Sequence, residues 1–427
     1  MTAEIAVYNK TAVALAADSA VTISGAGKHK IYNGAEKLFS LSKHHPVGLM
    51  VYGSGDLCSA PWELVIKAYR SKLNSDSFDT IEGYVDDFFK FLENTKDIVS
   101  DGMREEHQFT FLSEGVFQQL LDAFNKDKDN SYWLNYDVNN YLVELEKYSR
   151  ELLDTLSEME FLDGFSESDL SVAIASCSEF SPLIIKKFLN IENIDLLPVG
   201  LINAINEVFA AILCKKSDLG NVTGIVIAGY GNTDYYPKVI AYDVCGFANG
   251  KLRKSHNKDK CSENGISGVT PFAQDDEVSA FMQGCSGQLI ESLHTHYETA
   301  ICNFLEGIDL VINEEITPDK RELFQSRVVD VAKRTLSEID TKINVYMHEN
   351  YVRKVIEMVR FLPKQDLAYM AESLVNLTAF KRKVSEDSET VGGPIDVAVI
   401  SKADGFIWVR RKHYFEKNLN HHFFARS

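Results

Sequence analysis

The chain has 427 residues, 45% of them hydrophobic, so it is long enough to bury one large core or several ordinary ones. Its 62 Asp and Glu residues outnumber 44 Lys and Arg residues, and the net charge of −18 disfavours a nucleic-acid partner because phosphates would be repelled. Its seven cysteines are scattered and form no Cys-x-x-Cys pair, which argues against a disulfide framework or a zinc site.

The N-terminus, the apolar runs and the positions of the glycines and histidines argue against several further kinds of protein. The N-terminus lacks the basic and apolar stretches of a signal peptide, and no run reaches the ~18 apolar residues that a membrane span needs. The glycines form neither a phosphate-binding loop nor a dinucleotide fingerprint, and the histidines are too sparse for a metal site. We therefore expect a cytoplasmic protein without membrane contact, cofactor or metal.

The first 57 residues contain short runs of small and β-branched residues. The four runs lie at residues 2–7, 11–17, 37–41 and 47–52. A tight turn at Asn9-Lys10 joins the first two, and Gly53-Ser54-Gly55 closes the last. Short strands with brief turns between them predict an antiparallel sheet.

From about residue 61 to 214 the apolar residues recur at helical spacing. Tyr84, Phe88 and Phe91 fall at i, i+4 and i+7, and a longer stripe over 138–156 keeps that spacing for about five turns. Acidic and polar residues fill the opposite faces. This pattern predicts a bundle of amphipathic helices whose aromatic residues form a core and not a ligand site.

The remainder of the chain alternates between the two periods. Strands are expected at 224–229 and 237–244, helices at 286–312 and 319–383, and a last strand pair at 395–401 and 405–410. A polar loop is expected over 254–267, and there is no internal repeat. Strands, a helical block, strands, helices and strands in this order predict the α+β class.

Thr2 is the first candidate for chemistry. Removal of Met1, which is normal before a small residue, would leave a hydroxyl and a free α-amine on Thr2. The amine, with an unperturbed pKa of ~7.7–8.0, can take the hydroxyl proton at neutral pH, so one residue can be nucleophile and base. Many chains begin with Met-Thr, so a catalytic role for Thr2 has to be judged from the residues expected around it.

Asp18 and Lys37 are the residues that could support Thr2. Asp18 follows the second run and Lys37 opens the third. An N-terminal threonine needs an ammonium nearby to lower the pKa of its hydroxyl, and a carboxylate to keep that ammonium charged in a partly buried cleft. By residue type alone, a surface salt bridge is the commoner use of such a pair.

The N-terminal segment resembles the start of proteasome β-subunits and of the bacterial HslV peptidase, which are N-terminal-nucleophile (Ntn) hydrolases. The likeness consists of a threonine strand, an acidic residue before a Val-Thr turn, a Gly-x-x-Lys-Leu-Phe strand and a strand ending in Gly-x-Gly. These features lie at Thr2, Asp18, Val21-Thr22, Gly34 to Phe39 and Gly53-Ser54-Gly55.

Later segments extend this resemblance. Residues 224–243 look like the family's central hairpin, and Gly284-Cys-Ser-Gly-Gln resembles the turn that opens its third helix, so that Ser286 is the matching serine. Residues 392–405 resemble its closing strand pair. Just ahead of them, Asp387 and Thr390 match the family's Asp-x-x-Ser-Gly pattern only with a one-residue insertion and with threonine in place of serine, and Ser388 is the alternative position.

The resemblance implies a four-layer αββα sandwich with Thr2 in the cleft between its sheets. Residues 1–75 and 198–427 would form this domain, and 76–197 would be a helical insertion that caps the cleft, alters subunit packing or recruits a partner. The implied activity is that of a threonine peptidase acting on peptides or unfolded protein. It would work as a homo-oligomer, a ring or a dimer, and an ATP-dependent unfoldase could deliver its substrates.

The resemblance also assigns roles to the candidate residues. The Thr2 hydroxyl would attack a peptide carbonyl, with its amine as base, Lys37 tuning it and Asp18 orienting Lys37. The backbone around Gly53 and Ser54 would supply the oxyanion donor, a contact worth ~3–4 kcal/mol. The supporting network around the amine would comprise Ser286, Asp387 and Thr390.

Two other functions stay open, because a fold does not fix a function. Some Ntn hydrolases cleave small amides or acyl-peptides outside a ring, and proteasome α-subunits are non-catalytic scaffolds, so a scaffold or sensor subunit is the third candidate. The presence of Asp18, Lys37 and Ser286 together favours catalysis, since a purely structural relative does not need that set.

Overall fold

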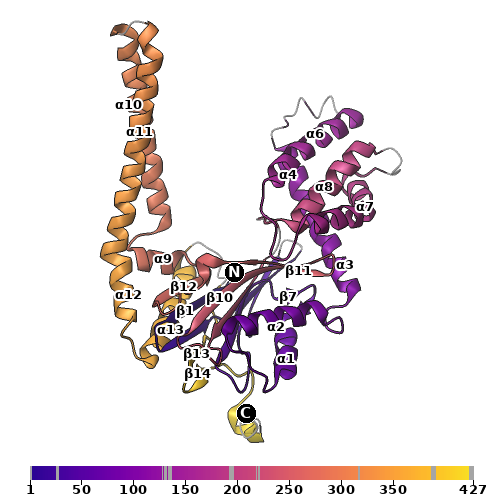
Figure 1. Cartoon of the computed structure of the whole chain (residues 1–427), viewed down its shortest axis with the longest axis vertical. Coiled ribbons are helices and arrows are strands. Elements are labelled where there is room, and N and C mark those ends of the chain that lie inside the picture. The colour runs from indigo at the N-terminus through magenta and orange to yellow at the C-terminus, as the bar shows by residue number, and fades with distance from the viewer. Residues whose placement is uncertain are drawn as a thin grey trace. The chain divides into compact units, whose positions relative to one another are not determined.

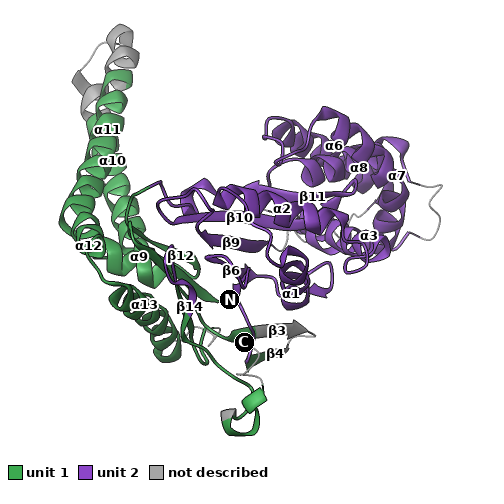
Figure 2. Cartoon of the chain, turned by 60° about the horizontal axis from the view of Figure 1, so that its bottom comes forward, with its two compact units in different colours: residues 1–33, 265–399, 408–427 green, residues 34–264, 400–407 purple. Residues whose placement is uncertain are grey.

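The computed structural model is a mixed α+β protein with antiparallel sheets, which confirms the expected class. It describes residues 2–25, 28–126, 128, 132, 137–191, 197–217, 219, 222–315, 318–385 and 391–422, without the side chains of 22–29, 309–325 and 417. The chain divides into two compact units (Figure 2). The first contains residues 1–33, 265–399 and 408–427, and the second contains 34–264 and 400–407.

The first unit is built on a five-stranded sheet, of which only residues within 400–407 belong to the second unit. Its strands, in spatial order, are β12 (Gly268–Ala273), β1 (Ala3–Tyr8), β2 (Ala12–Ala17), β13 (Asp396–Ser401) and β14 (Gly405–Arg410). β1 pairs antiparallel with both β12 and β2. The expected turn between β1 and β2 forms because the side chain of Asn9 accepts hydrogen bonds from the backbone N–H groups of Thr11 and Ala12.

Helices cover one face of this sheet. They are α9 (Asp276–Gln283), α12 (Arg353–Val359) and α13 (Lys364–Val384). Alternate residues of β1, namely Ala3, Ile5 and Val7, share a hydrophobic core with side chains of these helices such as Leu367 and Val375. All 6 residues of β1 are buried, so the opposite face of the strand is covered as well.

The first unit also carries a long helical hairpin. Its arms, α10 (Gly287–Glu315) and α11 (Pro318–Met347), lie side by side and stand out from the rest of the unit (Figure 1). A hydrogen bond of 2.6 Å from the hydroxyl of Tyr297 to Asp340 joins the two arms. The π-helix His348–Val352 connects α11 to α12, so the helical pattern expected over 286–312 and 319–383 is confirmed.

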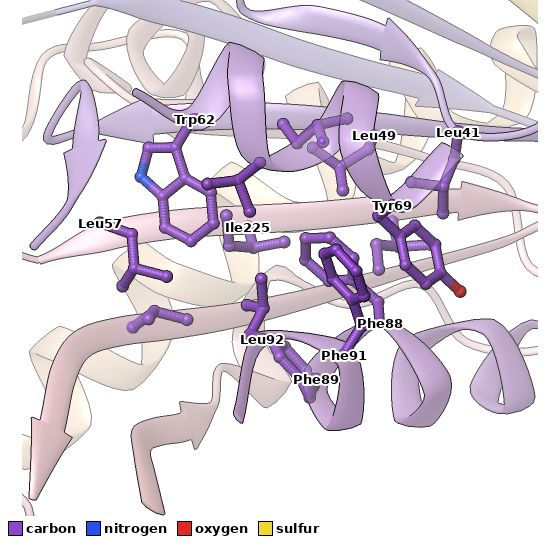
Figure 3. Packing of buried hydrophobic residues seen from close by; sticks show 14 of the residues in the cluster. Leu41, Leu49, Leu57, Trp62, Tyr69, Phe88, Phe89, Phe91, Leu92 and Ile225 are labelled. Atoms are coloured by element: carbon purple, nitrogen blue, oxygen red, sulfur yellow. The ribbon is translucent and has the colours of Figure 1, made fainter. Parts of the chain in front are cut away.

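The second unit is built on another antiparallel sheet. Its strands are, in spatial order, β11 (Lys251–His256), β10 (Lys238–Ala248), β9 (Thr223–Gly229), β6 (Val47–Gly53) and β5 (Leu38–Ser40). Helices α1 (Trp62–Leu73) and α2 (Ile81–Asn94) share a core with it (Figure 3). Tyr84, Phe88 and Phe91 all lie in this core, which confirms that the aromatic stripe serves packing.

A second hydrophobic core in this unit is formed by helices. They are α3 (Asp101–Thr110), the π-helix η1 (Phe111–Phe117), α4 (Gln118–Asn125), α6 (Val138–Ser157), α7 (Glu167–Leu189) and α8 (Val199–Cys214). The expected insertion, 76–197, stays a prediction. Within the unit, α2 packs with the sheet and α8 packs with the other helices.

Several strands differ from the expectation. The hairpin of β3 (Ala20–Gly25) and β4 (Lys28–Asn33), the short pair β7 (Asp56–Leu57) and β8 (Ala60–Pro61), and β12 were not expected. The polar loop predicted over 254–267 was partly wrong, because its first residues belong to β11. None of the described helices is both long and apolar enough to cross a membrane.

Candidate active site

Thr2 lies immediately before β1 and is only 6% exposed. Its Oγ1 donates a hydrogen bond of 2.9 Å to Oε2 of Glu4, and its carbonyl accepts one of 3.1 Å from the backbone N–H of Gln274. Residues two apart in an extended segment point to the same face, which explains why these two side chains meet. The Thr2 hydroxyl therefore has a fixed position beside a carboxylate, whereas Met1 lies outside the described residues.

Glu4 is the functional candidate that the sequence reasoning missed. It is fully buried and is the one charged residue of the β1 sequence Ala-Glu-Ile-Ala-Val-Tyr. Burying a carboxylate is costly unless it is hydrogen-bonded, and the hydroxyl of Thr2 supplies one such bond. An acidic residue within an otherwise apolar strand, two positions from a proposed nucleophile, is the signal that could have identified it.

Asp18 is fully buried where β2 ends, and its carboxylate accepts hydrogen bonds from three backbone segments. Its Oδ1 accepts from the N–H of Ala3 at 3.2 Å, and its Oδ2 accepts from the N–H groups of Ala20 at 3.3 Å and Gly392 at 2.9 Å. Carboxylates that accept several backbone N–H groups make strong, charge-assisted bonds. Asp18 thus holds the start of β1 in place, while its predicted role toward Lys37, in the other unit, stays a prediction.

The turn at Gly392 lies beside Asp18 and Ser19. The backbone N–H of Ser19 donates to the Gly392 carbonyl at 3.1 Å, and the Ser19 hydroxyl donates to the carbonyl of Pro394. At Gly393, φ is +77° and a Cβ would lie 2.8 Å from the Cβ of Asn33, so glycine is required. The closing segment of the predicted motif therefore lies against the residues that follow β2.

The predicted members of the network around the Thr2 amine are Ser286, Asp387 and Thr390. Ser286 precedes α10, and its Oγ accepts a hydrogen bond of 3.3 Å from the N–H of Leu289, which makes it a helix cap. In the described part of the chain, no hydrogen bond joins Ser286 to Thr2. Asp387 and Thr390 lie outside the described residues, so the network around the Thr2 amine stays a prediction.

The second unit holds the remaining predicted residues. Lys37 is buried just before β5, where its carbonyl accepts from the N–H of Val51 at 2.9 Å. Gly53 has φ of +86°, and a Cβ there would lie 2.2 Å from the carbonyl oxygen of Val222. The N–H of Ser54, the predicted oxyanion donor, makes a long hydrogen bond of 3.4 Å to that same oxygen. A bond of this length is weak, so little is lost when the N–H exchanges it for another acceptor.

The N-terminal cluster of the first unit, composed of Thr2, Glu4 and Asp18, has the arrangement of a nucleophile with a base. A hydroxyl within hydrogen-bond distance of a carboxylate can transfer its proton as it attacks. Among the described residues, no group of three or more His, Cys, Asp or Glu side chains is placed to hold a metal ion. Compared with the models of known protein families and with curated proteins, the chain matches none of them.

Proposed function

We propose that the chain is an Ntn hydrolase whose nucleophile is Thr2, a threonine peptidase that cleaves through an acyl-enzyme. The observation that carries this proposal is the hydrogen bond of 2.9 Å between the buried Thr2 hydroxyl and the buried Glu4 carboxylate. A buried nucleophile held against an acceptor is the arrangement that hydroxyl attack requires. The hydrogen bond from the N–H of Ala3 to Asp18 supports the proposal, since it holds the residue next to Thr2 and the reacting residue must be held in position.

The fold that we propose is the four-layer αββα sandwich. Each unit contributes an antiparallel five-stranded sheet, and each sheet packs helices against it. The residues of β1 and β9 are buried on both faces of their sheets, as the inner layers of such a sandwich would be. These features support the sandwich.

In the proposed reaction, the Thr2 hydroxyl oxygen bonds to the carbonyl carbon of a peptide bond. Its proton passes to the α-amine released when Met1 is removed, or to Glu4, and then to the leaving amine as the C–N bond breaks. Water then hydrolyses the threonine ester and restores the hydroxyl. Lys37 would lower the pKa of the hydroxyl, and the N–H of Ser54 would stabilise the oxyanion.

A peptidase of this kind would act in the cytoplasm on peptides or unfolded protein, as a homo-oligomer supplied by an ATP-dependent unfoldase. The second candidate function is a scaffold or sensor subunit. The hairpin of α10 and α11 favours it, because Leu293 and Phe304 are 49% and 66% exposed on α10, which holds none of the residues of the proposed reaction. Contiguous exposed apolar surface commonly marks contact sites for other proteins, and Phe304 lines a mostly apolar groove together with Val331 of α11.

The decisive experiment combines intact-mass analysis, N-terminal sequencing and labelling with a peptide epoxyketone, a reagent that needs both the hydroxyl and the amine of an N-terminal threonine. We expect Thr2 to be the first residue and to be labelled, and Thr2→Ala to abolish labelling. Thr11→Ala is the matched control, because Thr11 is an exposed threonine of the same unit whose side chain donates a hydrogen bond to Asn9. Met1 retained in the native host, or labelling that survives Thr2→Ala, would rule out this nucleophile.

A further inference from the structure

A cavity of about 540 Å³ lies within the second unit. Its lining comes from the segment after β6, from the end of α3 and the π-helix η1, and from the middle of β10. The residues that matter below are Ser54, Asp56, His107, Glu114 and Gly246. Cavities of roughly 300–1,000 Å³ are the usual size for ligand sites, and one of this volume accommodates a long side chain together with its backbone.

The charged side chains that line the cavity have one sign. Among the described residues that line it, Asp56 and Glu114 carry carboxylates, and none is Lys or Arg. Burial, together with the nearby guanidinium of Arg253, lowers the pKa of His107, so its imidazole is neutral at neutral pH. Lys187 lies 3.9 Å from Glu114 and offsets part of its charge, so Asp56, although it is exposed as well, is the stronger source of attraction for a cation.

The position of Asp56 is fixed by the backbone. Its Oδ1 accepts a hydrogen bond of 3.0 Å from the N–H of Ser59. Cys58 and Ser59 have φ of 50° and 69°, values that cost a non-glycine residue about 1–3 kcal/mol each. This short segment is therefore held in an unfavourable conformation, and it keeps the carboxylate at the edge of the cavity.

Another part of the wall is shaped by two irregular elements. β10 changes register between Val244 and Phe247, and inside this bulge Gly246 has φ of +92°. A Cβ at Gly246 would lie 2.7 Å from Cε1 of His107, so the strand can approach the ring only as glycine. The π-helix η1 presents Phe111, Glu114 and Gly115 to the same cavity, and such irregular turns are frequent at functional sites.

We propose that this cavity receives a basic side chain, lysine or arginine, of a polypeptide substrate. The cation would lie against Asp56 and Glu114. Ser54 lines the cavity and is also the proposed oxyanion donor, so under the proposed function the cavity would be one of the subsites for the substrate. In that respect the inference rests on the proposed function, but binding of the side chain can be tested without any hydrolysis.

The binding test uses the full chain with Thr2→Ala, so that nothing is cleaved, and two acetylated tripeptide amides that differ only in arginine or its neutral isostere citrulline. Titration calorimetry at low salt should show the arginine peptide binding at least about fivefold more tightly. Asp56→Asn, which keeps an acceptor for Ser59, should reduce that preference about three- to tenfold, and Glu114→Gln should reduce it less. Glu105→Gln is the control, because this exposed residue lies on α3 outside the lining.

Equal binding of the two peptides, or an equal effect of Glu105→Gln and Asp56→Asn, would overturn the inference. Circular dichroism of each variant shows whether it is folded. The second arm compares kcat/KM of the wild-type protein for fluorogenic versions of the same peptides. Hydrolysis without a preference for arginine would refute the basic subsite and leave the peptidase intact, whereas a binding preference without hydrolysis would refute the peptidase alone.

Discussion

The Glu4 carboxylate is one of the two groups that could take the proton of the Thr2 hydroxyl in the proposed reaction. Glu4→Gln keeps an oxygen that can accept the hydrogen bond of 2.9 Å but removes the charge that would take the proton. If Glu4 is the base, we expect kcat/KM for peptide hydrolysis to fall about 10²-fold or more, and epoxyketone labelling to slow with it. An unchanged rate in a folded Glu4→Gln protein would instead identify the α-amine as the only base.

Asp18 has a structural role that is independent of catalysis. In Asp18→Asn, one oxygen still accepts, but the amide nitrogen turns its N–H donors toward the backbone N–H groups of Ala20 and Gly392, or toward that of Ala3. Because a buried hydrogen bond to a charged group contributes about 1.5–3 kcal/mol, we expect the free energy of unfolding to fall by about 2–4 kcal/mol. Denaturant titration measures this, and the exposed Asp366→Asn in α13 should change it by less than about 0.5 kcal/mol.

His107 should make stability depend on pH. Its pKa is lowered in the folded protein, first by burial and then by Arg253. The unfolded chain takes up the proton near the ordinary pKa of about 6.5, so below that pH the unfolded state binds more protons and stability falls as the pH drops. His107→Gln should reduce the difference in unfolding free energy between about pH 7.5 and 5.5; an unchanged difference would show that other groups cause it.

At the scale of single elements, the bulge in β10 offers the sharpest test. Gly246→Ala would place a methyl group 2.7 Å from Cε1 of His107 on a backbone with φ of +92°. We expect this change to destabilise the protein by about 1–3 kcal/mol and to weaken binding of the arginine peptide, because the wall of the cavity must move. Gly250→Ala, also at positive φ but with open space around it, separates the conformational cost from the clash.

The same scale shows why some strands could be predicted and others could not. β1, β2 and β9 are buried runs of small and β-branched residues, a pattern that predicts strands from the sequence alone. β12 contains Pro271, which argues against a strand, but β12 is an edge strand, where the missing N–H is tolerated. β4 is largely polar, and it pairs only with β3 in a two-stranded sheet, so no hydrophobic alternation marks it.

At the scale of the whole molecule, the order of elements could be predicted, but the residues that converge could not. Asp18 and Gly392 are 374 positions apart, and their hydrogen bond depends on the pairing of β2 with β13. Glu4 lies close to Thr2 in the sequence, but it was missed. Strand periodicity predicts that the two side chains lie on one face of the strand, but it does not predict that they are hydrogen-bonded to each other. The chain leaves the first unit at residue 33 and returns at 265, a division that composition does not mark.

The hairpin of α10 and α11 can be tested as a separable part. Within the part of the hairpin whose side chains the structure describes, no residue belongs to the core that α9, α12 and α13 form with the sheet. Tyr297 and Asp340 lie at one level of the hairpin, so residues 298–339 can be replaced by a flexible linker of about four residues. We expect the midpoint of thermal unfolding to change by only a few degrees and labelling of Thr2 to persist, because neither depends on the removed segment. Loss of cooperative unfolding or of labelling would show that the hairpin is part of the folding unit, and sedimentation of the two proteins would show whether it joins copies of the chain.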